Sequence, residues 1–200
     1  MAKLYFYYSS MNAGKSTILL QSSYNYQEMG MKTMLFTAAL DDRHGSPKIS
    51  SRIGLEAEAE LFGQDDDLYD QVERHHKQER IACVLVDEAQ FLTKVQVEQL
   101  TDVADRLSIP VIAYGLRTDF QGKLFPGSER LLAIADEMRE VKTICRCGRK
   151  ALFNARLVGG RFVFDGDQVA IDELTADRVT YESMCAECYL GESGGRLDGR

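Results

Sequence analysis

The feature that most constrains the fold is a polar loop between a short apolar segment and a helix near the N-terminus. The aromatic run of residues 4–8 is typical of a buried strand, and residues 16–29 have a helical pattern that ends before Gly30. Backbone N–H groups at a helix N-terminus attract anions, so a loop at this point predicts phosphate binding. The loop and the first helical residue have the sequence Ser9-Ser10-Met11-Asn12-Ala13-Gly14-Lys15-Ser16.

The Gly-Lys-Ser end of this loop assigns chemical roles to single residues. Lys15 would reach the β- and γ-phosphates of ATP, and the Ser16 hydroxyl would hold Mg²⁺. The standard pattern G-x-x-x-x-G-K-[ST] begins with Gly, whereas this chain has Ser9 at that position. A chance Gly-Lys-Ser at a helix start is the alternative, and the strand–loop–helix context favours the nucleotide site.

Strands and helices alternate along most of the chain. This alternation predicts an α/β fold of the P-loop (RecA-like) type, with a mostly parallel sheet flanked by helices. Residues 41–54 are rich in Asp, Gly and Ser and predict a loop. The expected strands are 33–38, 81–86 and 109–114, and the expected helices are 68–79, 94–107 and 127–138.

The alternation ends near Lys142, where cysteines, glycines and short strand-like segments begin. We therefore expect a P-loop nucleotide-binding domain over residues 1–143 and a small zinc-binding domain over residues 144–190. Residues 191–200 contain four glycines and predict a flexible tail.

Two acids follow the apolar strand predicted over residues 81–86. Because ligands in open α/β sheets lie beyond the carboxyl ends of the strands, Asp87 suits a metal-binding role, directly or through water. Glu88 points to the other side of the strand and could accept a proton from an attacking hydroxyl. An ordinary polar strand end is the alternative, and the phosphate loop upstream favours function.

After the second strand, Asp41 could hold metal and Arg43 could stabilise a transferred phosphate, with a plain loop an equal alternative.

Four of the five cysteines form two close pairs, which suits a closed tetrahedral Zn²⁺ site with a structural role. Four unrelated reduced cysteines are the alternative. Cys83 lies in an apolar strand and is expected in the core. The predicted ligands are Cys145, Cys147, Cys185 and Cys188.

Composition excludes some classes of function. The net charge of −7 does not suit a protein that binds duplex nucleic acid through a basic surface. No segment approaches the roughly 18 consecutive apolar residues of a membrane span, and the N-terminus does not resemble a signal peptide. We therefore expect a cytoplasmic protein without nucleic-acid or membrane partners.

These motifs together resemble the type II thymidine kinases, a family that includes the cytosolic human enzyme and many bacterial ones. The resemblance covers about residues 3–190. Besides the loop and the cysteines, it rests on the segments 40–43, 87–91, 114–120 and 181–185. It implies an enzyme of nucleotide salvage that transfers the γ-phosphate of ATP to the 5′-hydroxyl of thymidine, with deoxyuridine as a further substrate. It also implies a homotetramer with structural zinc that is inhibited by thymidine triphosphate.

The resemblance further implies roles for individual residues. Glu88 matches the catalytic base, residues 9–16 match the ATP loop, and the segment Asp87-Glu88-Ala89-Gln90 matches a second nucleotide-binding segment. Residues 165–181 resemble a lasso loop that covers the base. The positions that match nucleoside contacts are Met11, Phe91, Leu116, Phe120, Phe125, Asn154, Val169, Ile171 and Tyr181.

The chain departs from the family pattern at several of these positions. Ser9 replaces the usual Gly, Ala89 stands where Gly or Cys is common, and Asn154 stands where Thr is common. Residues 171–180 replace a shorter Ile-Gly-Gly segment, which affects the lasso contacts and base specificity. Two other interpretations remain: a DNA-stimulated ATPase with a DExQ box, and a zinc-ribbon interaction module on a degenerate nucleotide-binding domain.

Overall fold

The computed structural model describes residues 1–39, 47–168 and 179–195. The chain divides into two compact units. The first contains residues 1–8, 14–115 and 126–140, and the second contains residues 9–13, 116–125 and 141–200. Each unit is described by itself below. Within the described ranges, no helix is both long enough and apolar enough to span a bilayer.

The first unit is built on a six-stranded sheet with the strand order β5-β2-β6-β7-β1-β8. The recorded pairings are parallel, as expected for an α/β fold. A parallel sheet gathers the carboxyl ends of its strands at one edge, where ligands bind in open α/β sheets. The strands are β1 (Leu4–Ser9), β2 (Lys32–Ala38), β5 (Glu60–Phe62), β6 (Ile81–Val86), β7 (Val111–Leu116) and β8 (Glu137–Glu140).

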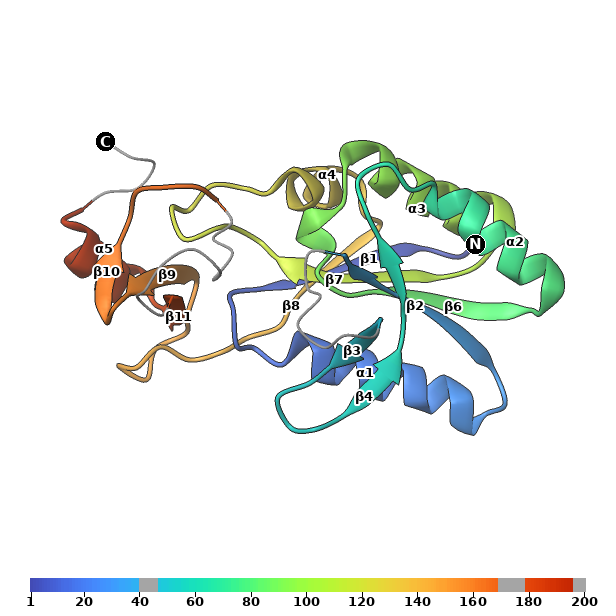
Figure 1. Cartoon of the computed structure of the whole chain (residues 1–200), viewed down its shortest axis with the longest axis horizontal. Helices are drawn as coiled ribbons and strands as arrows, with labels where there is room; N and C mark the ends of the chain where they lie inside the picture. Colours follow the sequence, from blue (N-terminus) through green and yellow to red (C-terminus); the bar gives the residue numbers. More distant parts are fainter. Residues whose placement is uncertain (40–46, 169–178, 196–200) are drawn as a thin grey trace. The chain divides into compact units, whose positions relative to one another are not determined.

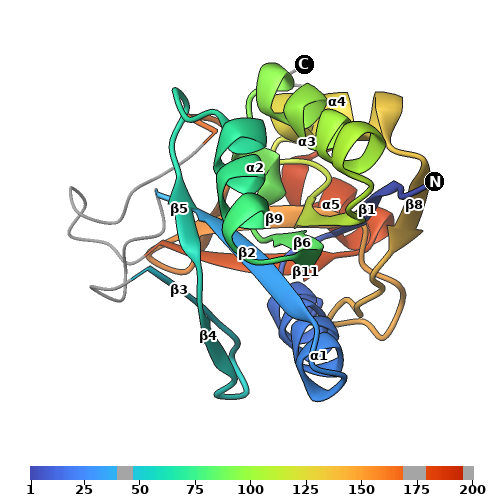
Figure 2. The same cartoon turned by 90° about the vertical axis from the view of Figure 1, so that its right-hand side faces the viewer.

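Helices cover both faces of this sheet. α1 lies on one face, and α2, α3 and α4 lie on the other (Figures 1 and 2). β6 illustrates why both faces are buried: Val84 and Val86 pack into one hydrophobic cluster, whereas Cys83 and Leu85 pack into the other, because successive residues of a strand face opposite sides. The helices are α1 (Lys15–Glu28), α2 (Leu68–Gln78), α3 (Lys94–Leu107) and α4 (Pro126–Ile134), with a 3₁₀ turn η1 (Ala89–Phe91) after β6.

Two sequence-based expectations for this unit were wrong. The helix expected over residues 127–138 ends at Ile134, and the chain then forms β8 beside β1. Asp136 favours this pairing, because its carboxylate accepts the Leu4 N–H at 2.7 Å and its own N–H donates to the Leu4 carbonyl at 2.9 Å. The loop expected over residues 41–54 contains β3 (Lys48–Ser50), which pairs with β4 (Glu56–Glu58). Three-residue strands are too short to show a period in the sequence.

The second unit contains a three-stranded antiparallel sheet with the order β10-β9-β11, followed by α5. The strands are β9 (Phe153–Val158), β10 (Arg161–Val163) and β11 (Val179–Met184), and α5 spans Ala186–Ser193. Its core is small and includes Ala155, Met184 and Tyr189, with the Tyr189 ring stacked on Phe153 at a centroid distance of 4.7 Å. Since α5 extends to the buried Ser193, residues 191–193 are helical and do not belong to the flexible tail that the sequence suggested.

Candidate functional site

Lys15 is a buried lysine at the start of α1 in the first unit. Gly14 precedes it in the left-handed conformation, with a φ of 83° that favours glycine, and Lys15 is the first residue of the helix. Only 8 % of Lys15 is exposed. Burial lowers the pKa of its ammonium group, while the nearby charges of Glu88 and Asp87 act against this change. A buried ammonium at a helix N-terminus is a suitable partner for a phosphate group.

Asp87 lies directly after β6 in the same unit and is 4 % exposed. Burial raises the pKa of its carboxyl group to about 7, and repulsion from Glu88 adds to the rise. A side-chain hydrogen bond with Ser16 acts in the opposite direction. The structure thus brings the hydroxyl of Ser16 and the carboxylate of Asp87 together. Oxygen donors of this kind are the ligands that Mg²⁺ prefers.

Glu88 has an unusual backbone that fixes the direction of its side chain. Its φ of 53° lies in the left-handed region, which is uncommon for a residue with a side chain, and its N–H donates to Asp87 Oδ1 at 3.0 Å. The side-chain amide of Gln90 donates a hydrogen bond to Glu88 Oε2. Gln90 is 1 % exposed, so the residues packed around it hold this donor in place. Backbone strain of this kind persists when surrounding contacts hold the residue in that conformation, and it often marks functional sites.

Gly115 in β7 makes room for Gln90. A Cβ atom at position 115 would lie 3.0 Å from both the backbone nitrogen and the Oε1 atom of Gln90. A larger residue would therefore require Gln90 to shift by a few tenths of an ångström. The sequence marked Gln90 as a nucleotide-binding residue, and the structure gives its side chain a contact with Glu88.

The remaining residues of the phosphate loop belong to the second unit. The Ser9 carbonyl accepts the N–H of Arg117 at 3.1 Å, and the Ser9 hydroxyl donates to the Ser10 carbonyl at 2.6 Å. Asn12 is exposed and has a φ of 61°, and Ala13 is half-buried.

Asn154 links three segments within the second unit. Its Oδ1 atom accepts the N–H of Met11 at 2.7 Å, and its Nδ2 atom donates to the carbonyl of Thr118 at 2.8 Å. Ser183, which pairs with Asn154 across β9 and β11, donates to the carbonyl of Met11. Met11 is thereby held through both of its backbone groups. Asn154 is 2 % exposed, and these contacts are with backbone groups of its own unit.

Phe120 and Tyr181 are brought together by a residue that the sequence did not indicate. The guanidinium carbon of Arg156 lies 3.7 Å from the centroid of the Phe120 ring, and Arg156 Nε donates to the Tyr181 hydroxyl at 3.1 Å. Arg156 Nη2 also donates to the carbonyl of Gln168 at 3.1 Å.

The other residues predicted for the site have different positions. Ala89 is buried and Phe91 is half-buried, both in η1 of the first unit, where Phe91 packs against the larger hydrophobic core. Leu116 is half-buried and Phe125 is buried in the second unit. The predictions for Asp41, Arg43, Val169 and Ile171 lie outside the described residues.

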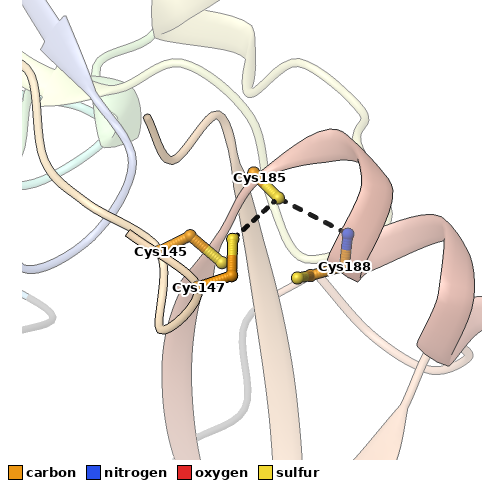
Figure 3. A group of neighbouring side chains, drawn as sticks. All are labelled: Cys145, Cys147, Cys185 and Cys188. Atoms are coloured by element: carbon orange, nitrogen blue, oxygen red, sulfur yellow. Dashed lines mark hydrogen bonds between the residues drawn. The ribbon is translucent and has the colours of Figure 1, made fainter. Parts of the chain in front are cut away.

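The four cysteines of the second unit form one cluster. Cys145 and Cys147 come from a loop and Cys185 and Cys188 from the start of α5, and their side chains point toward one another (Figure 3). All four sulfur atoms lie within 4.8 Å of one another, and those of Cys147 and Cys185 are 3.6 Å apart. Tetrahedral zinc with bonds of about 2.3 Å would separate its sulfur ligands by about 3.8 Å, so the residues fit this ion. The backbone N–H of Cys188 lowers the pKa of the Cys185 thiol to about 7, whereas hydrogen bonds with the neighbouring cysteines raise the pKa of Cys188 to about 12. The four thiols therefore interact closely with one another.

Sequence reasoning missed the residues that hold the site together. Arg156 belongs to a short strand of a small unit, where no motif distinguishes it from an ordinary polar residue. Ser183 lies in the segment 181–185 that carries the family resemblance, but its contact with Met11 was not predicted. One signal was available for Arg156, because it lies two residues after Asn154 and therefore faces the same side of a strand.

Comparison with known proteins shows which protein family this chain resembles. A family model described as "Thymidine kinase" matches residues 2–189. A protein of Pasteurella multocida named "Thymidine kinase" is 61 % identical over 190 residues, which cover 94 % of this chain and 97 % of that protein. A Shewanella oneidensis protein of the same name is 56 % identical with the same coverage. One of Agrobacterium fabrum is 60 % identical over 172 residues, which cover 86 % of this chain and 89 % of that protein.

Proposed function

Because the chain belongs to the thymidine kinase family, we propose that it transfers the γ-phosphate of ATP to the 5′-hydroxyl of thymidine. The observation that carries the proposal is a cluster of the first unit in which the buried Lys15 and Asp87 interact with the half-buried Ser16 and Glu88. Phosphoryl transfer depends mainly on positioning and on charge stabilisation, and this cluster offers both.

The groups around Lys15 would hold the phosphates. Lys15 would pair with the β- and γ-phosphates, and backbone N–H groups of residues 9–16 would contact them. Ser16 and Asp87 would hold Mg²⁺. The ion, when bound, would neutralise charge on the phosphate oxygens. Arg43 and Asp41 join this set by the family resemblance.

Glu88 would act as the general base. A carboxylate can accept the proton of the 5′-hydroxyl as the oxygen attacks the phosphorus, and such a group contributes roughly 10²- to 10⁴-fold to a rate. The hydrogen bond from Gln90 to Oε2 leaves Oε1 as the oxygen that can face a substrate hydroxyl. The left-handed backbone of Glu88 supports this role, since it sets the direction of the carboxylate before substrate binds.

Most of the proposed nucleoside contacts belong to the second unit, and Phe91 belongs to the first. We propose that the nucleoside contacts come from the set given by the family resemblance: Met11, Phe91, Leu116, Phe120, Phe125, Asn154, Val169, Ile171 and Tyr181. The hydrogen bonds of Asn154 to Met11 and Thr118 support a role in holding this pocket. A lasso over residues 165–181 would exclude water, which otherwise competes with the nucleoside as a phosphate acceptor.

The proposal extends to the ligands and the assembly of the protein. The four clustered cysteines would hold a structural Zn²⁺ that stabilises the small second unit. We further propose a cytoplasmic homotetramer that is inhibited by thymidine triphosphate, with a P-loop domain over residues 1–143 and a zinc domain over residues 144–190. The tetramer and the inhibition follow from the family resemblance, whereas the location and the domain bounds follow from the sequence pattern.

A phosphotransfer assay with labelled ATP tests the proposal. We expect thymidine to be phosphorylated in the presence of Mg²⁺, with deoxyuridine a weaker substrate and other nucleosides unreactive. A protein that hydrolyses ATP only when DNA is added, without phosphorylating any nucleoside, would be an ATPase instead. ATP binding without turnover on any acceptor would identify a degenerate nucleotide-binding module.

A further inference from the structure

Arg156 is a buried arginine of the second unit that contacts Phe120, Tyr181 and Gln168. It belongs to β9 and is 4 % exposed. Its guanidinium carbon lies 3.7 Å from the centroid of the Phe120 ring, and Phe120 is 1 % exposed. A cation over the face of an aromatic ring is attracted by the ring's quadrupole, and the attraction is larger where water is excluded.

The guanidinium group of Arg156 donates hydrogen bonds to two residues of the second unit. Nε donates to the Tyr181 hydroxyl at 3.1 Å, and Nη2 donates to the Gln168 carbonyl at 3.1 Å. Gln168 is itself fixed, since its side-chain amide donates to Asp119 Oδ2 at 2.9 Å. Arg156 therefore connects Phe120 to Gln168 and Tyr181.

Phe120 is also held from its backbone. The hydroxyl of Tyr189 donates to the Phe120 carbonyl at 2.7 Å. This second contact fixes the position of the main chain, whereas Arg156 covers the ring itself. The two contacts have separate effects, so removal of the Arg156 guanidinium releases the Phe120 ring while its backbone stays anchored.

We propose that Arg156 is a positioning residue that sets the affinity for the nucleoside through Phe120 and Tyr181. The inference rests on the proposed function, in which these two aromatic side chains contact the nucleoside. Rings that are already fixed in the binding conformation lose less conformational entropy when a ligand binds. Arg156 therefore affects the nucleoside KM, and it leaves kcat and the ATP KM nearly unchanged.

The first test compares Arg156→Lys and Arg156→Met with the wild-type enzyme in steady-state assays with ATP and thymidine. Lys keeps the charge but lacks the planar fork that stacks on a ring and donates to two acceptors. We expect the nucleoside KM to rise by about tenfold in both variants, with kcat and the ATP KM within about twofold. Arg161→Met, which changes an exposed arginine of the neighbouring β10, is the matched control and keeps all three constants.

Melting temperature and zinc content of each variant separate this role from a purely structural one. A purely structural role would lower the melting temperature and leave the nucleoside KM of the folded enzyme unchanged, and that result would overturn the proposal. If Arg156→Met does not fold, Arg156→Lys decides the question by itself. A wild-type enzyme that phosphorylates no nucleoside contradicts the proposed function, whereas unchanged KM values in an active variant contradict this inference alone.

A double-mutant cycle with Phe120→Leu tests whether Arg156 acts through the ring. If it does, Arg156→Lys raises the nucleoside KM by a smaller factor in the Phe120→Leu background than in the wild type, and the part that remains is the contribution through Tyr181. Effects of the two substitutions that multiply in full would show that Arg156 does not act through the Phe120 ring, and the proposal would then be wrong.

Discussion

The two units hold their candidate residues in different ways. In the first unit, the candidate groups are two pairs of adjacent residues at the ends of regular elements: Lys15 and Ser16 begin α1, and Asp87 and Glu88 follow β6. In the second unit, Met11, Thr118, Asn154 and Ser183 come from segments far apart in the chain, and single hydrogen bonds hold them together.

The difference shows how each unit keeps its groups in place. The first unit fixes its acids and its lysine with a six-stranded sheet whose two faces are both buried. The second unit has a small core and four clustered cysteines, so its geometry depends on few contacts. We therefore expect changes in the first unit to affect the chemical step, and changes in the second unit to affect folding of that unit and nucleoside affinity.

Removal of zinc should have the largest effect, and it should be confined to the second unit. Structural zinc contributes on the order of 10 kcal/mol to the folding of small metal-binding domains. We expect a chelator, or the substitution Cys185→Ser, to abolish amide-exchange protection in residues 145–190 while the strands of the first unit remain protected. Hydrogen-exchange mass spectrometry measures both regions in one experiment.

The matched control for Cys185→Ser is Cys83→Ser, which changes a cysteine of the first unit that lies outside the cluster. It should leave the zinc content and the protection of the second unit unchanged. Unaltered protection of residues 145–190 after complete metal removal would contradict a structural role for the ion.

Glu88→Gln should have the next largest effect, and it should act on the chemical step. The amide keeps the size of the side chain but cannot accept the proton, so kcat should fall by about 10³-fold. The dissociation constant for thymidine should change by less than about threefold, because the second unit is unaltered. Rapid-quench kinetics and calorimetric titration give the two quantities, and Glu98→Gln, an exposed glutamate in α3, is the control. Turnover near the wild-type rate would exclude Glu88 as the base.

Much of the first unit could be predicted from the sequence because its signals are local. The strand–loop–helix at residues 4–29 and the two acids after β6 are each contained in a short segment, and the residues that carry the chemistry are adjacent to the elements that position them. What the sequence did not show is the contact of Gln90 with Glu88. Gln90 makes that contact while packed closely against Gly115, which lies on another strand.

The second unit could be predicted only in outline. The spacing of the cysteines indicated a metal site, because ligand pairs are a local pattern. The contacts of Arg156 and Ser183 depend on strand register and on long-range packing, which leave no periodic trace in a short strand. The same reason explains the missed strand β8, whose pairing is set by Asp136 and Leu4 at a separation of 132 residues.

Asn154→Ala should have an intermediate effect, on affinity and not on the chemical step. The substitution removes the acceptor for the Met11 N–H and the donor to the Thr118 carbonyl, and each hydrogen bond contributes about 1 kcal/mol. We expect the thymidine KM to rise by about tenfold, with kcat within about threefold. Ser183→Ala removes one contact to the same Met11 and should have a smaller effect of the same kind. A loss confined to kcat would contradict the division of roles between the two units.

The smallest predicted effect is on the free energy of unfolding of the first unit at alkaline pH. Burial raises the pKa of the Cys83 thiol from 9.0 to about 12. The unfolded chain therefore loses this proton near pH 9, while the folded protein keeps it until about pH 12. In this range the folded state binds more protons, so the free energy of unfolding must fall as the pH rises, by at most about 1.4 kcal/mol per pH unit for one group.

Cys83→Ala removes this dependence. At pH 8 the variant should be less stable than the wild type by about 1 kcal/mol, because a small cavity remains. Since the wild type loses about 2 kcal/mol between pH 8 and 10.5, the difference should vanish near about pH 9.7 and reverse in sign by about pH 10.5. Urea unfolding at several pH values measures it. Val84→Ala, a neighbouring buried position of β6 without a titrating group, should keep a constant difference across the same range. Parallel pH profiles for wild type and Cys83→Ala would show that the thiol titrates as if it were exposed. The core around β6 would then exclude water less well than we infer from the comparison of the two units.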